Sequence, residues 1–456
     1  MMKHFTWQDF QQAENPMEAL RAAIRDYRCS AAFRNALEAD AYFSGRNTEV
    51  ARKTILRARK LETVDASGRR RVRCEMNDVA GNRISSGFLF RFICQQNSYL
   101  LQNGCIVSAE ARKMLGSDFD RALIALGERA LLHGTAWGFW NMDHLEILAA
   151  AEDRLSGFMP LYDEFSGEMM GGAQFWQLSP QRMMYIRLFE PDGVSILQCT
   201  PGGQVSIREK KRVYRMSRRT DMTGNSVTED GNWPRLPVFA LHANAARTSE
   251  FTPSIKTKID AYDRILSDFA DNLDRANDVY WVLNNFGGTS DDVIEMLTEI
   301  NRIKAVANIS DGTGGGSTAE PHTIEVPFAA RQAALTLLER ALYADYMAMN
   351  MEAISRGSMT NVAIKAVYAD LDLKSTHYEW EVAAFMHALL SMLGCDDTSV
   401  RFNRQRIINE GEIVQSISLM REDIDRAAAL RLNPLLETSE MERLLAADDA
   451  IPEAEK

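Results

Sequence analysis

Two long helical segments that bracket a short insert constrain the fold of this chain most. The first begins at Thr252-Pro253, where a capping residue precedes a proline in the first helical turn. The second covers residues 329–351 and contains neither glycine nor proline. The residues between them, 279–328, have the pattern of strands, a short helix and a glycine-rich loop. This arrangement predicts a rigid two-helix stalk that holds a small head away from the main body.

Apolar and acidic residues follow two separate lines along the first long helix. Each apolar position is three or four residues from the next, which is the period of one helix face. A helix of two dozen residues is about 36 Å long, and we expect copies of the chain to cover its apolar line. We interpret the acidic line as a solvated face or one that must not attract phosphate, with a Mg²⁺-binding nuclease cluster as the alternative. The apolar line is Ile255, Ile259, Tyr262, Leu266, Phe269 and Leu273, and the acidic line is Asp260, Asp263, Asp268, Asp271, Asp274 and Asp278.

Changes of periodicity divide the rest of the chain. Residues 1–75 have a helical, polar pattern and end in a basic run, 46–73, with ten Lys or Arg and three acids. Two interpretations of this run stay open: a contact with nucleic acid or a partner, and a solvated pair of helices. A further helical region stops at Gly134, and alternation with period two then predicts a β-rich domain. A third long helix is predicted for residues 362–393.

Charge and cysteine content bear on partners and compartment. The chain has 63 Asp or Glu against 52 Lys or Arg, which gives a net charge of −11. A protein that grips nucleic acid needs Lys and Arg opposite the phosphates, so the acidic balance argues against gripping. The six cysteines are scattered, as is typical of a reducing cytoplasm. The chain has no apolar secretion signal, and its apolar stretch 382–395 is shorter than the ~20 residues that span a bilayer. We therefore expect a soluble protein without a membrane partner.

Motifs for catalysis and metal binding lack essential members. The glycine loop 312–318 is not followed by the lysine of a phosphate-binding P-loop, and we interpret it as a flexible hairpin tip. His377, Glu381 and His387 do not form the H-E-x-x-H pattern of zinc peptidases, and a packed or solvated face explains them. Carboxylate pairs such as Asp163-Glu164 fit loop chemistry. The sequence therefore predicts no enzyme, no metal site and no cofactor.

Six segments carry a family resemblance. In chain order they are NSYLLQNG near Asn97, ALLHGTAWGFWN near His133, FMPLYDEFSGEM near Asp163, IRLFEPDGVSIL near Pro191, LPVFALHANAARTSEFTPSIKTKIDAYDRILSDFADNLDRANDVYWVLNNFGG, and GSMTNVAIKAVYADLDLKSTHYEWE. Together they cover roughly residues 85–395, and they resemble the portal proteins of tailed bacteriophages, the head-to-tail connectors. The N-terminal segment and the acidic tail have no such match.

The resemblance implies an α+β fold, mainly α, known as the portal fold. Its stem and clip agree with the stalk and head that the helices and insert predict. On this chain the parts would be an N-terminal helical arm (1–84), a β-rich α/β wing (85–244), a first stem helix (245–278), a small α/β clip (279–328), a second stem helix (329–351), a tunnel loop (352–362), a long wing and tunnel helix (363–395), and a helical crown with the acidic tail (396–456).

The resemblance also implies a function and partners. A homo-oligomeric ring, usually of twelve subunits, would assemble in the host cytoplasm and occupy one capsid vertex of the virion. It would pass double-stranded DNA during packaging and ejection. It would dock the terminase large subunit, the head-tail adaptor, and the major capsid and scaffolding proteins. Such a conduit handles DNA without holding it, which agrees with the acidic balance of the chain.

Two groups of residues follow from this reading. Repeated carboxylates repel DNA weakly beyond about 8–10 Å at physiological salt. Polar residues of the tunnel loop, which bends at Gly357, would touch the DNA directly, and Lys365 and Lys374 of the third long helix would form a weak basic ring. The expected channel residues are Asp260, Asp263, Asp271, Asp274, Asp278, Arg356, Gly357, Ser358, Thr360, Asn361, Lys365 and Lys374. The clip residues expected to dock the motor and adaptor are Asn285, Asp291, Asp292, Glu295 and Glu299.

Two other classes of protein stay open at this stage. A non-viral ring-forming scaffold or adaptor would use the stalk and its apolar line for assembly alone. A DNA-packaging enzyme, such as a terminase subunit, would need a Walker A motif, and the sequence has none.

Overall fold

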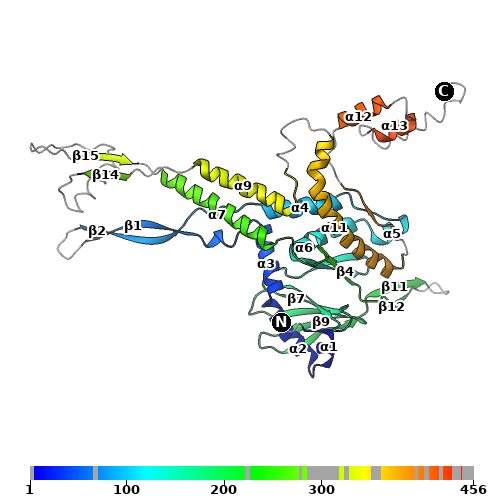
Figure 1. The fold of residues 1–456 in the computed structure, drawn as a ribbon. Coiled ribbons are helices and arrows are strands. Elements are labelled where there is room, and N and C mark those ends of the chain that lie inside the picture. Colours follow the sequence, from blue (N-terminus) through cyan, green and yellow to red (C-terminus); the bar gives the residue numbers. More distant parts are fainter. Residues whose placement is uncertain are drawn as a thin grey trace, which may run out of the picture. The chain divides into compact units, whose positions relative to one another are not determined.

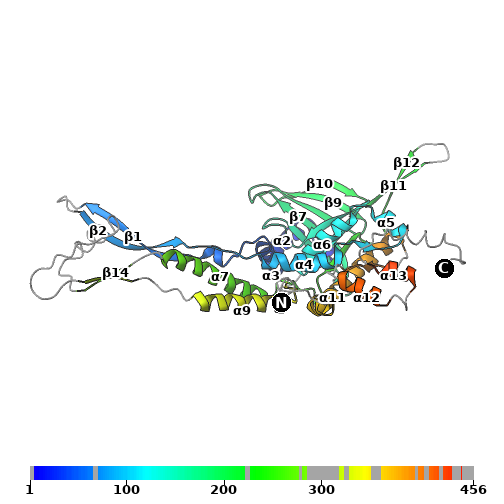
Figure 2. The ribbon, with the colours of Figure 1, turned by 90° about the horizontal axis from the view of Figure 1, so that it is seen from above.

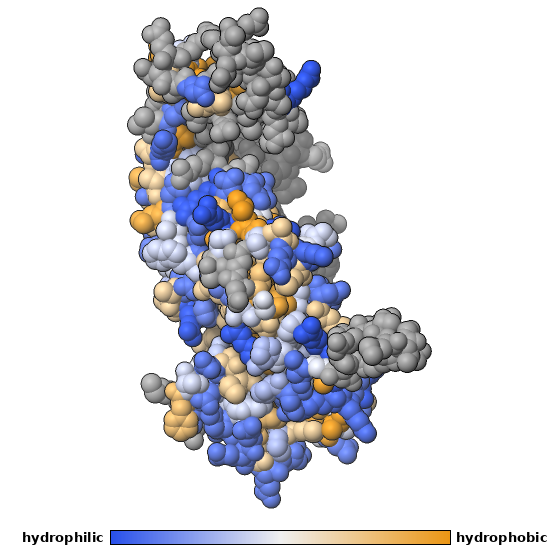
Figure 3. Space-filling view, turned by 90° about the vertical axis from the view of Figure 1, so that its right-hand side faces the viewer, coloured by the Kyte–Doolittle hydropathy of each residue, from blue (hydrophilic) through white to orange (hydrophobic). Residues whose placement is uncertain are grey.

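The computed structural model describes residues 5–64, 70–220, 226–276, 280–284, 318–322, 328–350, 361–395, 399–404, 410–420, 425–433 and 443. Helices and antiparallel strands are mixed along the chain (Figures 1 and 2). On the face drawn in Figure 3, hydrophilic and hydrophobic residues are interspersed. The chain forms two compact units, and each combines segments that are distant in sequence. The first unit comprises Met1–Ala39, Arg91–Phe251 and Tyr343–Lys456, and the second comprises Asp40–Phe90 and Thr252–Leu342.

A five-stranded antiparallel sheet organises the first unit. Buried and half-buried residues alternate along much of the sheet, as in the central strand β8, because one set of side chains enters the core. The two-residue connection Pro191-Asp192 places Glu190 opposite Gly193 and joins β8 to β9 in a tight hairpin. In spatial order the strands are β10 (Val205–Arg212), β9 (Gly193–Cys199), β8 (Met184–Glu190), β7 (Met169–Gln177) and β6 (Gly157–Tyr162).

Two short N-terminal helices complete the core of this sheet. Helix α1 (Trp7–Gln12) begins with a capping box at Thr6, and α2 (Pro16–Arg28) has Asn15 as its cap and Pro16 in its first turn. Their apolar faces join the sheet in one buried cluster that includes Trp7, Ile24 and Phe175. The adjoining strand positions must be glycines. A Cβ on Gly171 would meet the Trp7 ring, and one on Gly172 would meet the ring of Phe158.

A second, three-stranded sheet follows helix α6 (Phe119–His133). Gly134 ends this helix in the left-handed conformation, with φ of 84°, and a Cβ there would meet the backbone of residues 247–249. The central strand is β4 (Thr135–Asn141). It lies between β13 (Val238–His242) at one edge and β5 (His144–Ala149) at the other. Helix α11 (Asn361–Leu393) packs on this sheet, and its Phe385 ring meets Phe239 edge to face at 6.4 Å.

Residues 205–220 of the first unit form two separate strands. The stretch from Val205 to Met216 is divided into β10 and β11, and the buried Tyr214 lies between them. Its hydroxyl is 2.7 Å from the Glu190 carbonyl oxygen and 2.9 Å from that of Gly193, so the break is held against the β8–β9 turn. The remaining elements that include first-unit residues are α3 (Ala31–Phe43), α4 (Phe88–Leu101), β3 (Cys105–Ile106), α5 (Ala109–Leu115), β11 (Arg215–Thr220), β12 (Ser226–Gly231), β16 (Arg401–Phe402), α12 (Glu410–Leu419) and α13 (Arg426–Leu432).

The second unit contains the two predicted stem helices side by side. Helix α7 (Pro253–Ala276) begins where the cap and proline indicated, and the Thr252 hydroxyl accepts a hydrogen bond from the Ile255 amide at 3.4 Å. Helix α9 (Phe328–Tyr346) lies beside it, and the Phe269 and Phe328 rings meet edge to face at 5.2 Å. It ends earlier than the predicted residue 351, because Met347 has a left-handed φ of 62° and residues 348–350 are not helical. Between them in sequence, β14 (Tyr280–Asn284) pairs with β15 (Thr318–His322). The rest of the predicted insert and the loop 352–360 lie outside the described residues.

The N-terminal arm differs from its prediction. Residues 54–64 and 70–80 are not helical: β1 (Thr54–Val64) and β2 (Arg70–Ala80) form an antiparallel pair that follows the 3₁₀ turn η1 (Val50–Arg52). The described part of the basic run is therefore not the pair of helices that was one of its two interpretations. Its dense charge hid the period of two, because clean hydrophobic alternation is the signal that identifies a strand.

Candidate functional site: the polar face of the stem helix

Most of the described residues that were expected in a channel lie on α7, but one of its polar faces is buried. Asp260, Asp263, Ser267 and Asp271 are spaced by three, four and four residues, so they share one side of the helix. Their exposed fractions are 6%, 0%, 0% and 5%. Residues of the same unit between Tyr42 and Ser86 cover them.

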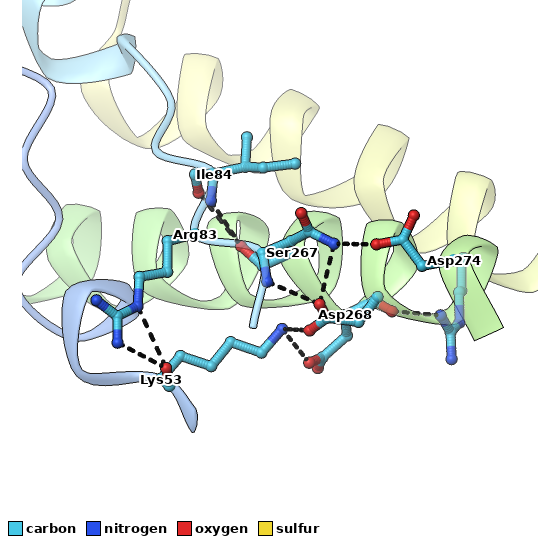
Figure 4. A network of polar contacts seen from close by, with 9 residues as sticks. Lys53, Arg83, Ile84, Ser267, Asp268 and Asp274 are labelled. Carbon is cyan, nitrogen blue, oxygen red and sulfur yellow. Dashed lines mark hydrogen bonds and ion pairs between the residues drawn. The ribbon is translucent and has the colours of Figure 1, made fainter. Parts of the chain in front are cut away.

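An extended segment, residues 81–86, lies along this face, and we call it the strap. The amides of Asn82, Ile84 and Ser86 each donate to one α7 side chain. The acceptors are Asp271 Oδ1 at 2.7 Å, Ser267 Oγ at 3.0 Å and Asp263 Oδ1 at 2.9 Å, respectively. Figure 4 shows this contact from Ile84 to Ser267.

The spacing of the two backbones explains why this ladder of bonds repeats. Two residues of extended chain advance about 6.6 Å, and four residues of α-helix advance about 6.0 Å. Every second strap amide therefore meets every fourth helix side chain, with the two chains antiparallel. Because N–H groups of an extended chain need acceptors when they leave water, the polar face of α7 substitutes for a neighbouring strand.

Asp260 and Asp263 continue the contact toward residues 42–47. The Tyr42 hydroxyl donates to Asp260, which also accepts a bond from Lys256 Nζ at 2.8 Å. Burial, followed by the bond to Asp260, raises the pKa of Tyr42 to about 12. Asn47 Nδ2 donates to Asp263 Oδ2 at 2.8 Å. Burial raises the pKa of Asp263 despite its bonds from Ser86 and Asn47.

Lys53 supplies the cation of this face. Its ammonium lies 2.5 Å from Asp271 Oδ2 and 2.8 Å from Asp268 Oδ1, as Figure 4 shows for Asp268. Burial acts to lower the pKa of Lys53, but the bonds to both carboxylates outweigh it and raise the pKa. Burial likewise acts to raise the pKa of Asp271, and the bonds from Lys53 and Asn82 outweigh it, so that pKa is lowered.

The expectation of a solvated acidic line is therefore wrong for Asp260, Asp263 and Asp271. These side chains bind their own chain, and a buried carboxylate is not available to DNA, so we no longer place them in a channel. Asp274 is exposed and accepts a bond from Asn82 Nδ2 at 2.8 Å. Asp278 lies outside the described residues.

The two lysines expected to form a basic ring differ from each other. Lys365 is exposed on α11. Lys374 is held inside the first unit: its Nζ is 2.7 Å from Glu250 Oε2, 2.8 Å from the Tyr346 carbonyl oxygen and 3.3 Å from the centre of the Tyr346 ring. Burial lowers the pKa of Lys374, against the raising effect of Glu250. Because the ammonium is engaged within its own chain, we withdraw Lys374 from the channel.

The other expected residues lie at the boundary of the described chain or beyond it. Asn361 is the half-buried first residue of α11. Arg356, Gly357, Ser358 and Thr360 of the tunnel loop lie outside the described residues, and so do Asn285, Asp291, Asp292, Glu295 and Glu299 of the clip.

Sequence reasoning did not identify the groups that bind the acidic face. Asn47, Lys53, Asn82 and Ser86 lie 177 to 218 residues from their partners. The available signal was local: Asn82 and Ser86 flank the apolar Ile84 at alternate positions, while the acids of α7 recur at helical spacing. Neither pattern identifies the residues of the other as its hydrogen-bonding partners.

Metal-binding clusters and membrane-spanning helices are the remaining site types that bear on function. Across the described residues, no three His, Cys, Asp or Glu side chains form a cluster suited to a metal. His377 is exposed and meets the exposed ring of Trp380 edge to face at 5.1 Å, in agreement with a solvated face of α11. In that same part of the chain, no helix is long and apolar enough to cross a membrane.

Comparisons with known proteins agree on one family. The family model described as "Phage portal protein, SPP1 Gp6-like" matches residues 33–453. The portal protein of Clostridium phage phiCD119 is 28% identical over 175 residues, which cover 38% of this chain and 38% of that protein. The portal protein of Bacillus phage SPP1 is 27% identical over 226 residues, 46% of this chain and 43% of that protein. The alignments thus span less than half the length of these relatives.

Among solved structures, a chain titled "Virion of native gene transfer agent (GTA) particle" aligns with 79% of this chain and 89% of its own length. Its sequence identity is 12% and the TM-score is 0.40. The family match covers all but the first 32 and last three of the 456 residues and includes the stem helices, the strap and both sheets. The protein therefore belongs to the SPP1 Gp6-like family of phage portal proteins.

Proposed function

We propose that this portal protein forms a ring at one capsid vertex of a phage particle and conducts double-stranded DNA during packaging and ejection. The observation that carries the proposal is the family match over residues 33–453. We expect twelve subunits of 51.3 kDa, roughly 0.6 MDa in total. Assembly would take place in the host cytoplasm, with the virion as the final location.

The paired stem helices support this reading. Helices α7 and α9 are the long elements that a channel wall requires, and a strand pair, β14–β15, interrupts them in sequence. We assign residues 279–328 to the clip, which would dock the terminase large subunit and then the head-tail adaptor. Its proposed contact residues remain Asn285, Asp291, Asp292, Glu295 and Glu299. The major capsid and scaffolding proteins are the further partners that we propose.

The chemistry of a conduit requires weak contact with DNA. Binding to DNA weakens steeply with salt when a protein neutralises several phosphates, and such binding would stall a moving duplex. The ladder removes Asp263 and Asp271 from solvent, and the contact with Tyr42 removes Asp260, so the exposed acid that we propose for the described stem is Asp274. We retain Asp278, Asn361, Lys365 and the loop residues Arg356, Gly357, Ser358 and Thr360 as proposed channel groups.

Electron microscopy of the purified full chain tests the proposal. We expect closed rings with a central channel and a narrow protrusion at one end. A chain that stays monomeric at high concentration would contradict it. ATPase and nuclease assays on the same preparation address the enzymatic alternative, for which we expect no turnover above a buffer control.

A further inference from the structure

The turn between β6 and β7 presents an exposed aromatic side chain between two acids. Phe165 is 92% exposed, and Glu164 and Glu168 beside it are exposed as well. Phenylalanine is among the residue types most often buried, so a ring that is 92% exposed leaves nearly all of its apolar area open to a partner. We call residues 163–168 the tip.

The tip is rigid, because Asp163 binds its backbone. Its Oδ1 accepts bonds from the amides of Phe165 at 3.0 Å and Ser166 at 2.7 Å, and Gly167 closes the turn with φ of 69°. Gln8 of α1 fastens the tip from outside: its side chain donates to Asp163 and accepts from the Glu164 amide at 3.0 Å. A side chain on such a support loses little freedom when it binds a partner.

A basic pocket lies at the opposite end of the same sheet. Arg21, Arg25 and Arg28 follow one face of α2, at spacings of four and three, and line a cavity of about 220 Å³. Its lining, as far as the chain is described, contains no carboxylate. The buried side chains of Ile24, Met184 and Cys199 form its apolar part. The cavity is smaller than the roughly 300–1,000 Å³ of pockets for drug-sized molecules, and its size suits one or two side chains.

The arginines of this pocket have unused hydrogen-bonding capacity. Nε of Arg21 is buried without a hydrogen-bond partner among the described residues, which is costly unless a ligand supplies one. Arg25 has a weak contact with Asp26 at 3.8 Å, with both side chains 79% exposed. Arg28 donates to the carbonyl oxygen of Arg154 at 3.2 Å. Guanidinium groups bind carboxylates in a forked, charge-assisted geometry.

The tip and the pocket cannot meet within one chain. Strand β7 begins beside the tip at Met169 and ends beside the pocket at Gln177, so roughly 26 Å of extended strand separates them. A cyclic ring, however, needs two different, complementary surfaces on each subunit, because every contact joins the leading side of one copy to the trailing side of the next.

We propose that the tip of one subunit docks in the basic pocket of the neighbouring subunit, with Phe165 against the apolar part and Glu164 and Glu168 toward the arginines. This inference rests on the ring of the proposed function. Charge complementarity selects a second copy as the occupant: the tip is acidic and apolar, and the pocket is basic and apolar. The pocket is incomplete without the partner copy, because its own chain leaves Arg21 Nε unsatisfied.

Disulfide trapping gives the first test. Glu164→Cys and Arg25→Cys are combined in a Cys29→Ser background, since Cys29 is an exposed free thiol near the pocket. A disulfide needs Cα atoms within about 7 Å, so the two new cysteines cannot pair within one chain. We expect a ladder of covalent multimers on a non-reducing gel, absent from each single-cysteine variant. Closed rings of the double variant without any ladder would overturn the inference and leave the proposed function intact.

Removal of the aromatic ring and reversal of the charges give the second test. Phe165→Ala, Glu164→Arg and Arg25→Glu should each raise the concentration for half-maximal ring assembly by at least about tenfold, the scale of a central interface contact. Glu164→Arg combined with Arg25→Glu should recover part of that loss. Glu110→Arg, which reverses an exposed acid on α5, is the matched control. Mass photometry measures assembly, and circular dichroism verifies folding. Unchanged assembly of all three single variants would overturn the docking, whereas a monomeric wild-type chain would overturn the proposed function itself.

Discussion

Asp263 shows how a charged residue can serve as a packing group. It is fully buried, yet one oxygen accepts from the Ser86 amide and the other from Asn47. A buried carboxylate is costly unless each lone pair finds a donor. The strap supplies those donors, and the carboxylate in turn satisfies a strap amide that has no strand partner. Each group therefore depends on the other, so removing either leaves a buried polar atom unpaired.

The first prediction follows from that dependence. Asp263→Ala should lower the free energy of unfolding by about 2–3 kcal/mol, because the Ser86 amide and Asn47 lose their acceptor. Asp274→Ala, one turn from the ladder and exposed, should change it by less than about 0.5 kcal/mol. Urea unfolding measures both values. Hydrogen exchange of the Asn82, Ile84 and Ser86 amides should quicken in Asp263→Ala alone, and equal exchange in the two variants would contradict the ladder.

Lys53 gives a prediction with a pH signature. The lowered pKa of Asp271 contributes stability that is present above the ordinary value of 3.8 and lost as the pH falls through the lowered one. The raised pKa of Lys53 contributes stability that is present below 10.5 and lost as the pH rises through the raised value. Lys53→Met should therefore cost about 3 kcal/mol near neutrality, with a plateau between about pH 5 and 9.

The same variant should approach the wild type in stability only as the pH falls below 3.8 and through the lowered pKa of Asp271, because protonated Asp271 no longer attracts an ammonium. Arg52→Met, at the neighbouring exposed position, is the matched control and should be near neutral at every pH. Unfolding in denaturant at a series of pH values measures the difference. A loss of stability in Lys53→Met that does not vary with pH would assign Lys53 a packing role instead of a charge role.

At the scale of elements, two helix ends use one motif with different residues. Helix α9 ends at Met347 with φ of 62°, where the Ala348 amide donates to the Tyr343 carbonyl at 3.0 Å. Helix α11 ends at Gly394 with φ of 81°, where the Cys395 amide donates to the Leu390 carbonyl at 3.0 Å. Both patterns are Schellman ends, which favour glycine. Met347, which directly follows α9, therefore has a strained backbone conformation.

Substitutions at these two helix ends should have opposite effects on the free energy of unfolding. Met347→Gly should raise the free energy of unfolding by up to about 1 kcal/mol, because glycine enters the left-handed region without a Cβ penalty. Gly394→Ala should lower it by about 1–2 kcal/mol. Among the described residues other than its two chain neighbours and the backbone of its own helix, no atom lies within 4 Å of a Cβ built at Gly394, so the backbone conformation sets this cost. Urea unfolding tests both, and effects of the same sign would refute the strain assignment.

The elements also show which features could be predicted from sequence. Thr252-Pro253 marks the start of α7, Gly134 ends α6, and Pro191-Asp192 joins β8 to β9, because caps and turns depend on adjacent residues. The β1–β2 pair was missed because its strands lack clean hydrophobic alternation. The burial of Asp263 was missed because its partners at positions 47 and 86 come together only in the folded second unit.

At the scale of the whole molecule, the effect of the net charge depends on which of the charged residues are exposed. A charge of −11 per chain does not describe a uniform acidic surface, because Asp260, Asp263 and Asp271 of the stem are buried and bonded. Charges that act on DNA must be exposed and must recur once per subunit. A single exposed residue on α7 is therefore amplified by the number of subunits in the proposed ring.

Asp274 allows that amplification to be measured. Asp274→Lys would add one exposed ammonium per subunit, or about twelve phosphate-binding groups in the proposed dodecamer. We expect slower DNA packaging in vitro at about 50 mM salt and partial recovery at about 200 mM, because salt weakens phosphate contacts steeply over that range. Asp274→Asn separates loss of the acid from gain of the base, and Glu110→Lys on α5 places the same charge change outside the stem. Rings of Asp274→Lys that form normally and package at the wild-type rate at both salt concentrations would exclude Asp274 from the channel wall.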